Sequence, residues 1–441
     1  MSFLTRAEPR STTSDRGQPA APPTLGLGLG LLMVLALGHF SAAVMRNLPS
    51  VVAPDIQSTF AMGDATLGLL HGPAFAVVNV IAILVAAAFI DRIDRFRVMA
   101  LCMAGWSLGS LAFALAPTRD ALFAARIVVG LSQAAFTPCA VSLIIDRCGQ
   151  GFGRPLSMFT AGSALGRSAG ILLGGTVLAL VALLPIVGEG LADWRLASAL
   201  LALPSLALAA VLMGYRDRRA TSTSGHPPFT DTLAWGWRRR AALVPYLLAS
   251  GALILMTQAT TAWMPSVFRR VLDLETAEAA MTAGLAVLIG APVGHAVGGW
   301  AVDRWQVAER TPPGLMAIAL LAVAVMGTGL VFSDGPVTLF LTACGLAMAL
   351  GVGGLAALAG FQPITPPHRR GSVTALYLAA VGLIGMGLGP PMVGLVSQGA
   401  FGSGTGLASA MAVVIVAAAG LGLLAAWRAT SVWHQLAHPD D

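Results

Sequence analysis

The sequence contains no lysine, and all 26 of its basic residues are arginine. A phosphate-binding P-loop and a Schiff-base centre both require lysine, so neither ATP-driven pumping by this chain alone nor imine chemistry is expected. Charged residues make up only 10% of the chain, whereas soluble domains have about 25%. So few charges cannot cover the surface of a water-soluble protein of 441 residues. This excludes an ordinary soluble enzyme, a disordered chain and a nucleic-acid-binding protein.

Cysteine is also scarce, and its spacing carries no metal or disulfide signature. No two of the four cysteines form a CxxC pair, and three of them lie in apolar runs. We therefore expect no metal centre, no disulfide framework and no cofactor. The cysteines are interpreted as small apolar residues that fill space between helices. They are Cys102, Cys139, Cys148 and Cys344.

Apolar residues, which make up 56% of the chain, are gathered in long runs. A helix needs about 20 apolar residues to cross a bilayer. Twelve runs of this kind lie at residues 26–53, 66–90, 98–117, 121–145, 156–185, 195–214, 241–264, 279–302, 313–333, 335–360, 372–398 and 404–427. The sequence therefore predicts an all-α integral membrane protein with twelve transmembrane helices.

One long polar connection divides the runs six and six, which predicts two six-helix bundles. The predicted division is a disordered cytoplasmic tail at 1–24, an N-terminal bundle at 25–214, a cytoplasmic linker at 215–240, a C-terminal bundle at 241–428 and a cytoplasmic tail at 429–441. With both termini in the cytoplasm, the cytoplasmic segments hold 19 of the 26 arginines. Because cytoplasmic loops are enriched in Arg and Lys, this orientation is favoured. The composition, rich in Ala, Gly and Arg, is typical of a GC-rich bacterial genome and hence of a bacterial inner membrane.

Two features recur at nearly the same spacing in both halves. Asp91-Arg92 follows the second run, and Asp303-Arg304 follows the eighth run 212 residues later. Gly170 in the fifth run and Gly389 in the eleventh are 219 residues apart. A duplication into two pseudo-symmetric bundles explains both, and it predicts a site at their interface near the bilayer midplane. Glycines spaced by four let helices approach closely. They could serve static packing or a surface on which the bundles rock, and the sequence leaves both open.

Several motifs resemble the major facilitator superfamily. They are Asp91, Arg92 and Arg95 after the second run, Asp303 and Arg304 after the eighth, Arg126 and Gly130 in the fourth, and Asp193-Trp194-Arg195 before the sixth. Within the superfamily the chain is most similar to the spinster-like branch, through residues 67–75, 106–107, 363–371, 375–377 and 385–390. The resemblance implies a secondary transporter that works by alternating access and is often coupled to protons.

The resemblance also assigns roles and exposes departures. In the family, an Asp at such a helix end pairs with Arg across the cytoplasmic interface and stabilises the outward-open state. This implies a gating role for Asp91, Arg92, Arg95, Asp303 and Arg304. Val44 and Gln133 stand where this branch has the carboxylates that carry protons. Three other positions also depart from the family: Asn79 replaces an expected Tyr, Asp94 replaces a Gly, and Ile171 replaces the Pro of the antiporter motif. The usual proton carriers are therefore absent.

Three arginines lie within the predicted spans, namely Arg46, Arg126 and Arg167, whereas no Asp or Glu lies deep in any span. An unpaired guanidinium buried in the membrane costs several kcal/mol, so each should meet water, a carbonyl or an anion. A cavity that attracts an anionic substrate explains all three, because Arg binds carboxylate and phosphate groups with paired hydrogen bonds. The alternatives are carbonyl binding by Arg126, snorkelling by Arg167 and an interfacial position for Arg46.

Uncharged polar residues complete the predicted binding site. Gln133 shares a helix face with Arg126, and Asn79, Gln258 and Tyr377 are further candidates. Each of these residues could instead form an interhelical hydrogen bond. His71 and His295, which both lie within predicted spans, either carry a proton or bond to a carbonyl.

The combined prediction is a secondary active or facilitative transporter. It would act as a monomer in the lipid bilayer and move a small organic anion or an anionic amphiphile across the inner membrane. A multidrug efflux antiporter is the alternative. A membrane sensor on a transporter fold is less favoured, because the 215–240 linker and the C-terminal tail are too short for a signalling domain. No span presents paired carboxylates, HExxH or a plausible Ser-His-Asp set, so an enzyme is not expected.

Overall fold

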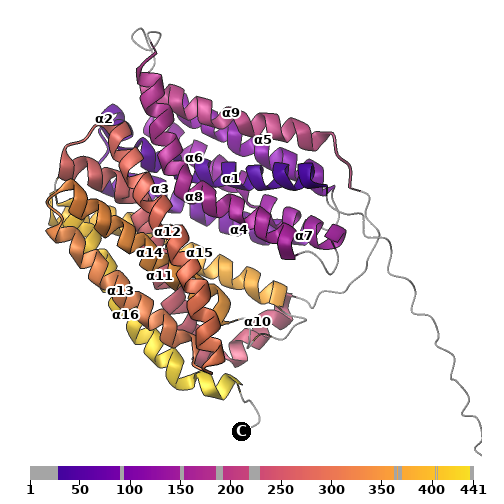
Figure 1. The fold of residues 1–441 in the computed structure, drawn as a ribbon. Coiled ribbons are helices and arrows are strands. Elements are labelled where there is room, and N and C mark those ends of the chain that lie inside the picture. The colour runs from indigo at the N-terminus through magenta and orange to yellow at the C-terminus, as the bar shows by residue number, and fades with distance from the viewer. Residues whose placement is uncertain are drawn as a thin grey trace, which may run out of the picture.

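The structure is a computed structural model. It describes residues 28–89, 94–148, 153–184, 192–217, 229–361, 365, 370–402, 404 and 406–437. All regular elements among these residues are helices (Figure 1). Twelve helices or pairs of consecutive helices are long and apolar enough to cross a membrane. This confirms the all-α, twelve-span prediction. The expected tail at 1–24 lies outside the described residues.

The first six spans form one bundle, coloured from indigo to magenta in Figure 1. Within it, α1 packs along α8, and α5 packs along α9. The elements of this bundle are α1 (Leu29–Val51), α2 (Ala53–Phe60), α3 (Asp64–His71), α4 (Pro73–Phe89), α5 (Arg95–Ala114), α6 (Arg119–Gln133), α7 (Phe136–Cys148), α8 (Gly153–Ala182) and α9 (Asp193–Met213).

The last six spans form the second bundle and repeat the pairing of the first. Here α11 packs along α15 and α13 packs along α16, which match α1 with α8 and α5 with α9. This confirms the two pseudo-symmetric bundles. The elements are α11 (Arg240–Leu272), α12 (Thr276–Val307), α13 (Pro312–Gly329) with the 3-10 turn η4 (Leu330–Phe332), α14 (Pro336–Gly360), α15 (Arg370–Ala400) and α16 (Leu407–Ala437). The linker between the bundles contains a short helix, α10 (Phe229–Arg238).

Two spans that were expected as single helices are broken in the middle. The second span is divided into α3 and α4 at Gly72, directly before Pro73. The fourth is divided into α6 and α7 at 134–135. Proline has no N–H to donate to the carbonyl four residues earlier. Pro138 therefore leaves the carbonyl of Ala134 without its helical partner, and Pro73 does the same for Leu69. Each break leaves backbone carbonyls inside the membrane without a helical partner, so these carbonyls need other hydrogen-bond donors.

The molecule has two ends that differ in how the bundles meet. We call them the Asp64 end, which holds Asp64, Arg270 and Ser397, and the Arg95 end, which holds Arg95 and Asp217. At the Asp64 end, α3 of the first bundle packs along α15 of the second. At the Arg95 end, α7 packs against α5 and α8 of its own bundle, whereas α10 packs against α11 and α15. The ribbons of α7 and α10 lie well apart in Figure 1.

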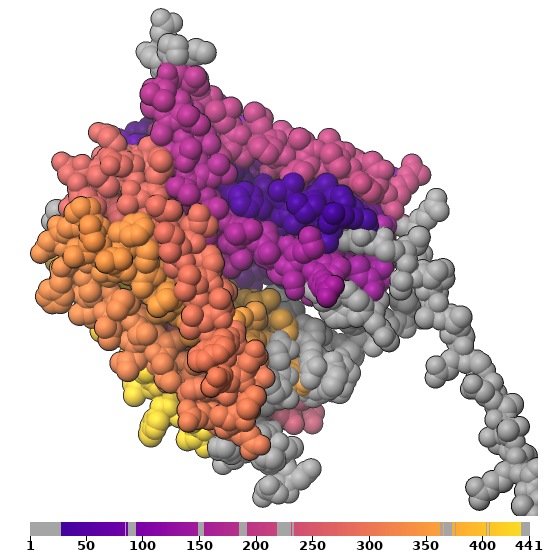
Figure 2. All heavy atoms as spheres, viewed as in Figure 1, coloured from indigo at the N-terminus to yellow at the C-terminus, as the bar shows by residue number. Residues whose placement is uncertain are grey.

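Glycines bring the two bundles into backbone contact along α8 and α12, which lie against each other in Figure 2. A Cβ atom on Gly175 of α8 would lie 2.8 Å from the backbone nitrogen of Met281, and one on Gly284 of α12 would overlap the backbone of Leu172. In contrast, Gly166 and Gly170 face α1 of their own bundle. The glycines of α8 thus provide close packing both within the first bundle and against the second.

The contact at Gly284 leads to a stability prediction. Gly284→Ala inserts a methyl group against backbone that cannot move aside, so we expect it to destabilise this packing by about 1–3 kcal/mol. Gly420→Ala is the matched control, because a Cβ atom there would meet nothing within 4 Å. The melting temperature of the purified protein should fall for Gly284→Ala and stay within about a degree of wild type for the control. Equal melting temperatures would contradict the direct backbone contact.

Candidate functional site

Two of the three predicted membrane arginines contact the same aromatic ring. The Cζ atoms of Arg46 and Arg126 each lie 5.3 Å from the centroid of the Phe75 ring. Phe75 is fully buried at the start of α4, directly after the break at Gly72. A guanidinium over an aromatic face is stabilised by the ring quadrupole. The ring therefore offsets part of the cost of burying the two charges.

Arg126 is satisfied by backbone carbonyls. Its guanidinium donates to the carbonyl oxygens of Leu70 at 3.4 Å, Met45 at 3.4 Å and Arg46 at 3.1 Å. The side chain is only 2% exposed. Leu70 lies in the last turn of α3, whose final carbonyls lack helical donors because the helix ends at His71. Arg126 therefore ties α6 to α1 and to the break in the second span.

Gln133 and Asn79 also bond within the first bundle. The oxygen of the Gln133 side chain accepts from Nη2 of Arg46 at 3.0 Å and from its Nε at 3.3 Å. The amide nitrogen of Gln133 donates to the carbonyl of Ala42 at 2.8 Å. Asn79 donates to the carbonyl of Gly130 at 2.8 Å. Gln133 thus places a neutral acceptor beside Arg46, where the resembling branch would place a carboxylate.

Arg167 differs from the other two arginines. It lies in the middle of α8, is half-buried, and makes no hydrogen bond or ion pair with any described residue. It interacts electrostatically with Arg46, and Arg46 interacts with Arg126. The structure thus gathers the three residues into one arginine cluster (Arg46, Arg126 and Arg167). None of them forms an ion pair with a described carboxylate.

A small cavity of about 20 Å³ lies beside the cluster, between the two bundles. It brings the predicted residues Arg46 and Gln258 to one site, although they belong to different bundles. The broken second span borders the cavity, since His71 and Phe75 lie on either side of its break. The lining residues are Arg46, Asn47, Ser50, His71 and Phe75 from the first bundle, and Gln258, Thr261, Ala262, Met386 and Pro390 from the second.

The remaining uncharged candidates lie elsewhere. Tyr377 lies within the second bundle, with its ring centroid 4.5 Å from that of Phe361, and the structure does not bring it to the arginine cluster. His295 is exposed and bonds to the carbonyl of Ala291 in its own helix at 2.7 Å. Of the two alternatives for His295, carrying a proton or bonding to a carbonyl, this contact is the second.

The predicted gating residues are only partly described. Asp91 and Arg92 lie outside the described residues. Asp303 and Arg304 are exposed, and neither forms an ion pair with a described residue. Arg304 instead lies over the ring of Trp300 at 5.1 Å.

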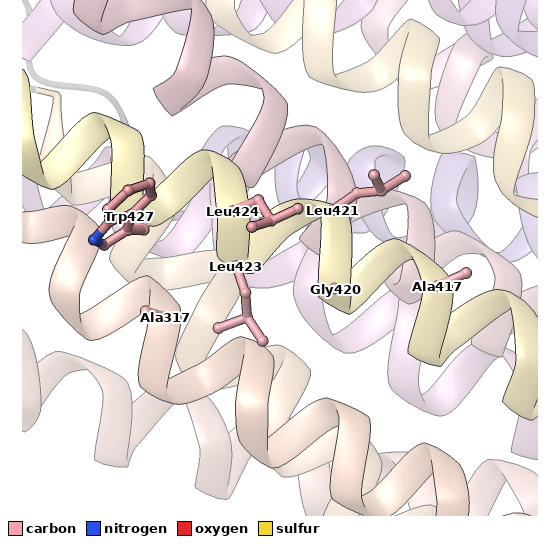
Figure 3. Close-up of a pocket in the computed structure, with 7 residues that line it drawn as sticks. All are labelled: Ala317, Ala417, Gly420, Leu421, Leu423, Leu424 and Trp427. Atoms are coloured by element: carbon pink, nitrogen blue, oxygen red, sulfur yellow. The ribbon is translucent and has the colours of Figure 1, made fainter.

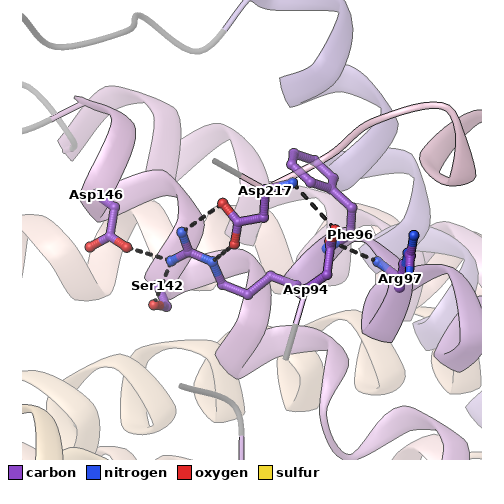
Figure 4. Close-up of polar contacts among 7 residues, drawn as sticks. Asp94, Phe96, Arg97, Ser142, Asp146 and Asp217 are labelled. Carbon is purple, nitrogen blue, oxygen red and sulfur yellow. Dashed lines mark hydrogen bonds and ion pairs between the residues drawn. The ribbon is translucent and has the colours of Figure 1, made fainter. Parts of the chain in front are cut away.

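Arg95, also a predicted gating residue, is the centre of a buried polar network (Figure 4). Its guanidinium bonds to Asp217 at 2.6 Å, Asp146 at 2.5 Å and Ser142 at 2.9 Å. Asp94 beside it caps α5 by accepting from the backbone nitrogens of Phe96 and Arg97. In this conformation Arg95 therefore joins α5 to α7 and to the start of the linker, and its partners all belong to the first half of the chain.

The Asp64 end holds a network that the sequence analysis missed. Asp64 is fully buried and forms an ion pair with Arg270, with N–O distances of 2.6 and 2.8 Å. It also accepts from Gln57 and from Ser397, each at 2.7 Å. These residues come from α2, α3, α11 and α15, so the network joins the two bundles. The sequence signal was an Asp and an Arg at span ends on the same predicted side, but Arg270 was considered only as a marker of topology.

Two further contacts close the same end. Thr276 of α12 donates to the carboxylate of Asp55 in α2 at 3.2 Å, and the side-chain oxygen of Gln398 accepts from the backbone nitrogen of Ala65 at 3.1 Å. Burial is the main cause that raises the pKa of Asp55 above its ordinary value. The Asp64 end is thus held by several bonds between the bundles.

A second hollow lies on the outer face of the second bundle and has a different character. It is an open groove of about 910 Å³ on α13 and α16 (Figure 3). Its lining residues are Ala317, Ala417, Gly420, Leu421, Leu423, Leu424 and Trp427. Apart from the indole nitrogen of Trp427, their side chains are entirely apolar. Such a surface fits hydrocarbon and carries no group for chemistry or for recognition of a charged cargo.

Residues 35–390 match the family model of the Major Facilitator Superfamily, and the chain belongs to this family. The expected similarity is therefore confirmed. An MFS-type efflux pump of Mycolicibacterium smegmatis is 25% identical over 375 residues, which is 83% of each chain. A gallate transporter of Pseudomonas putida is 27% identical over 400 residues, which is 84% of this chain and 85% of that one.

Solved structures of the same fold include a bacterial homolog of the human lysosomal transporter Spinster. In its inward-facing and unoccupied conformation it aligns with a TM-score of 0.78 at 20% identity, over 95% of this chain and 98% of that one. A D-xylose–proton symporter aligns with a TM-score of 0.69 at 15% identity, over 89% of this chain and 96% of that one. The chain is thus a multi-pass membrane transporter of small molecules, and its bacterial relatives imply the inner membrane.

The Asp64–Arg270 pair leads to a conformational prediction. Arg270→Gln leaves a buried carboxylate unpaired, which costs about 3 kcal/mol or more. Because the pair joins the two bundles, we expect this cost to favour the conformation in which the Asp64 end is open. Spin labels at exposed Thr59 of α2 and exposed Glu275 before α12, in a variant without the native cysteines, should show a longer distance population.

The neighbouring arginine provides the control. Arg269 is exposed, so Arg269→Gln should leave the spin-label distances as they are in wild type. Identical distance distributions for Arg270→Gln and Arg269→Gln would show that the buried pair does not hold this end closed.

Proposed function

We propose that the chain moves a small organic anion or an anionic amphiphile across the inner membrane by alternating access, as a monomer. The observation that carries this proposal is the arginine cluster, which places three guanidinium groups in the membrane interior without a described carboxylate partner. An anion that enters the space between the bundles gains charge-assisted hydrogen bonds there. A cation would be repelled.

The three arginines are proposed to have different roles. Arg126 already donates to three carbonyls, so it supports the broken helices. Arg46 has one side-chain acceptor, Gln133, although a guanidinium carries five N–H donors. Arg167 has no described acceptor at all. Arg46 and Arg167 therefore have donors to offer to a carboxylate or phosphate of the cargo, whereas Gln133 orients Arg46.

The proposed orientation places both termini and the Arg95 end in the cytoplasm. It is supported by the concentration of arginine in the segments on that side. The Asp64 end then faces away from the cytoplasm and is closed by the Asp64–Arg270 network. The conformation is accordingly proposed to be open to the cytoplasm, in line with the inward-facing structure to which the fold is similar. Asp303 and Arg304, near the C-terminal end of α12, are proposed to form ion pairs only when this side closes.

The sequence relatives support an anion but also a second candidate. Gallate, the cargo by which one relative is named, is an organic anion. Another relative is named an efflux pump, and Phe75, Ala262, Met386 and Pro390 make part of the cavity apolar. Multidrug efflux is therefore the second candidate. It would show as resistance of an overexpressing strain to lipophilic cations, which the arginine cluster disfavours.

Loss of Arg167 should reduce transport of the anion. We expect Arg167→Gln to lower transport efficiency, kcat/KM, by about 10- to 100-fold, because one charge-assisted hydrogen bond contributes roughly 1.5–3 kcal/mol. The measurement is uptake of a panel of labelled organic anions into proteoliposomes, beginning with gallate. Arg428→Gln, which removes an exposed arginine near the end of α16, is the control and should transport normally.

One outcome would count against the anion site, and a variation of the same assay tests proton coupling. Wild-type uptake by both Arg126→Ala and Arg167→Ala, at equal amounts of reconstituted protein, would contradict it directly. Running the same assay with and without a proton gradient tests the coupling. A rate that does not respond to the gradient would agree with the missing membrane carboxylates, and a strong response would assign coupling to another group.

A further inference from the structure

Two buried polar atoms face the cavity between the bundles without a protein partner. They are Nδ2 of Asn47 and Nε2 of His71, which find no hydrogen-bond acceptor or donor among the described residues. Both side chains are only 8% exposed, and both line the same cavity of about 20 Å³. An unsatisfied buried polar group costs about 1–3 kcal/mol. Two such groups at one cavity indicate an occupant that satisfies both.

The groups around this cavity are mostly donors. Arg46 contributes N–H groups, Asn47 and Gln258 contribute amide nitrogens, and His71 can present an N–H at Nε2. The lining contains no carboxylate. A metal cation would therefore find no anionic ligand, whereas an anion would find several N–H groups among the lining residues. The lining residues therefore favour a hydrogen-bond acceptor, such as an anion, as the occupant of the cavity.

The volume limits the size of the occupant. A cavity of about 20 Å³ holds a single water-sized particle. A carboxylate with its carbon skeleton does not fit in this conformation, but a monatomic ion does. From size and chemistry together, we propose that the cavity between Arg46, Asn47, His71 and Gln258 is a binding site for one chloride-sized halide ion.

Electrostatics favours a halide over a water molecule. The arginine cluster puts three positive charges into the membrane interior, and no described carboxylate pairs with them. A transported cargo compensates these charges only while it is bound. A resident monovalent anion beside Arg46 lowers the cost of the cluster throughout the rest of the cycle. The halide site shares Arg46 with the proposed cargo site, but it does not depend on the identity of the cargo and so goes beyond the proposed function.

The position of the site links the ion to the conformation. Arg46, Asn47 and His71 belong to the first bundle, whereas Gln258 and Thr261 belong to the second. An ion held by both sides stabilises the state in which the bundles meet here, since it binds that state more tightly than a separated one. Chloride should therefore stabilise the closed Asp64 end.

The first experiment measures thermal stability of the purified protein in sodium gluconate with increasing sodium chloride or sodium bromide, at constant ionic strength. We expect a saturable rise in melting temperature of about 2–4 °C when the halide reaches tenfold its dissociation constant. Gluconate and sulfate are too large for the cavity. The same series in Arg167→Gln, which lacks a proposed cargo arginine, should show the same halide-dependent rise, because the halide does not bind through Arg167. Equal melting temperatures in chloride and gluconate would show that water occupies the cavity, and would overturn the proposal.

A matched pair of variants tests the location. Asn47→Asp supplies a fixed negative charge beside Arg46, so it should remove the halide dependence of the melting temperature. Asn79→Asp makes the same chemical change at an asparagine that bonds to Gly130 and does not line the cavity. It should lower the melting temperature in every salt but keep the halide-dependent rise. A rise that persists in Asn47→Asp would place the halide elsewhere and overturn the proposal.

Trp263 offers an optical readout at the same place. Its ring centroid lies 5.9 Å from that of His71, in an edge-to-face arrangement. Bromide bound in the cavity should quench its fluorescence with a saturable component that chloride reverses, and Trp263→Phe should lose only this component. If the halide tests fail while Arg167→Gln still loses anion transport, the proposed function stands and the halide site falls. The reverse result would retain the halide site alone.

Discussion

The cost of placing guanidinium groups inside a membrane governs the architecture around the site. In hydrocarbon, a charge without partners is unfavourable by several kcal/mol. Two of the three membrane arginines, Arg126 and Arg46, have partners here that are not acids. Arg126 takes backbone carbonyls, Arg46 takes the side-chain oxygen of Gln133, and both lie against the ring of Phe75. The carbonyl of Leu70 is available because the second span breaks after α3. The carbonyl of Met45 is available because Pro49 of α1 has no N–H to donate to it.

The breaks depend in turn on close contact between helices. The segment around Gly72 can leave the helical path only if a neighbouring helix fills the space. A Cβ atom on Gly68 would lie 2.8 Å from the carbonyl oxygen of Pro390, and one on Gly72 would lie 2.5 Å from that of Met386. Pro390 lacks the N–H that would otherwise bond to Met386 in a helix. The irregular parts of α3–α4 and of α15 therefore face each other across the bundle interface, where only glycine leaves enough room.

The sequence was sufficient for the fold, because hydrophobic length and arginine placement do not depend on tertiary contacts. Twelve spans in two bundles follow from apolar runs and from one polar connection. The helix breaks were missed, although Pro73 and Pro138 were visible, because proline inside a span can also be tolerated in an unbroken helix. The three membrane arginines were predicted to serve one anion-attracting cavity, but not to contact one ring or to have these particular partners. That Arg46 and Gln258 line one cavity depends on how the bundles meet, which no pattern along a single chain encodes.

Asp64 is a second residue whose environment could not be predicted from the sequence. A carboxylate at the first residue of a span reads as an interfacial group, and its position along the sequence agrees with that interpretation. Its complete burial results from α3, α11 and α15 converging on it, together with Gln57 of α2. Burial of a charge is a property of the assembled bundles rather than of the segment that carries it.

The distribution of charge between the bundles has a consequence for the transport cycle. Arg46, Arg126 and Arg167 all belong to the first bundle, on α1, α6 and α8, whereas the second bundle contributes neutral groups such as Gln258 and Thr261 to the cavity. When the bundles move relative to each other, a neutral surface passes a charged one, and no ion pair among the described residues has to break at the centre. The ion pair that has to break is Asp64–Arg270, at one end. Opening of that end and binding at the centre are therefore carried by different residues, which allows a substitution in one to leave the other intact.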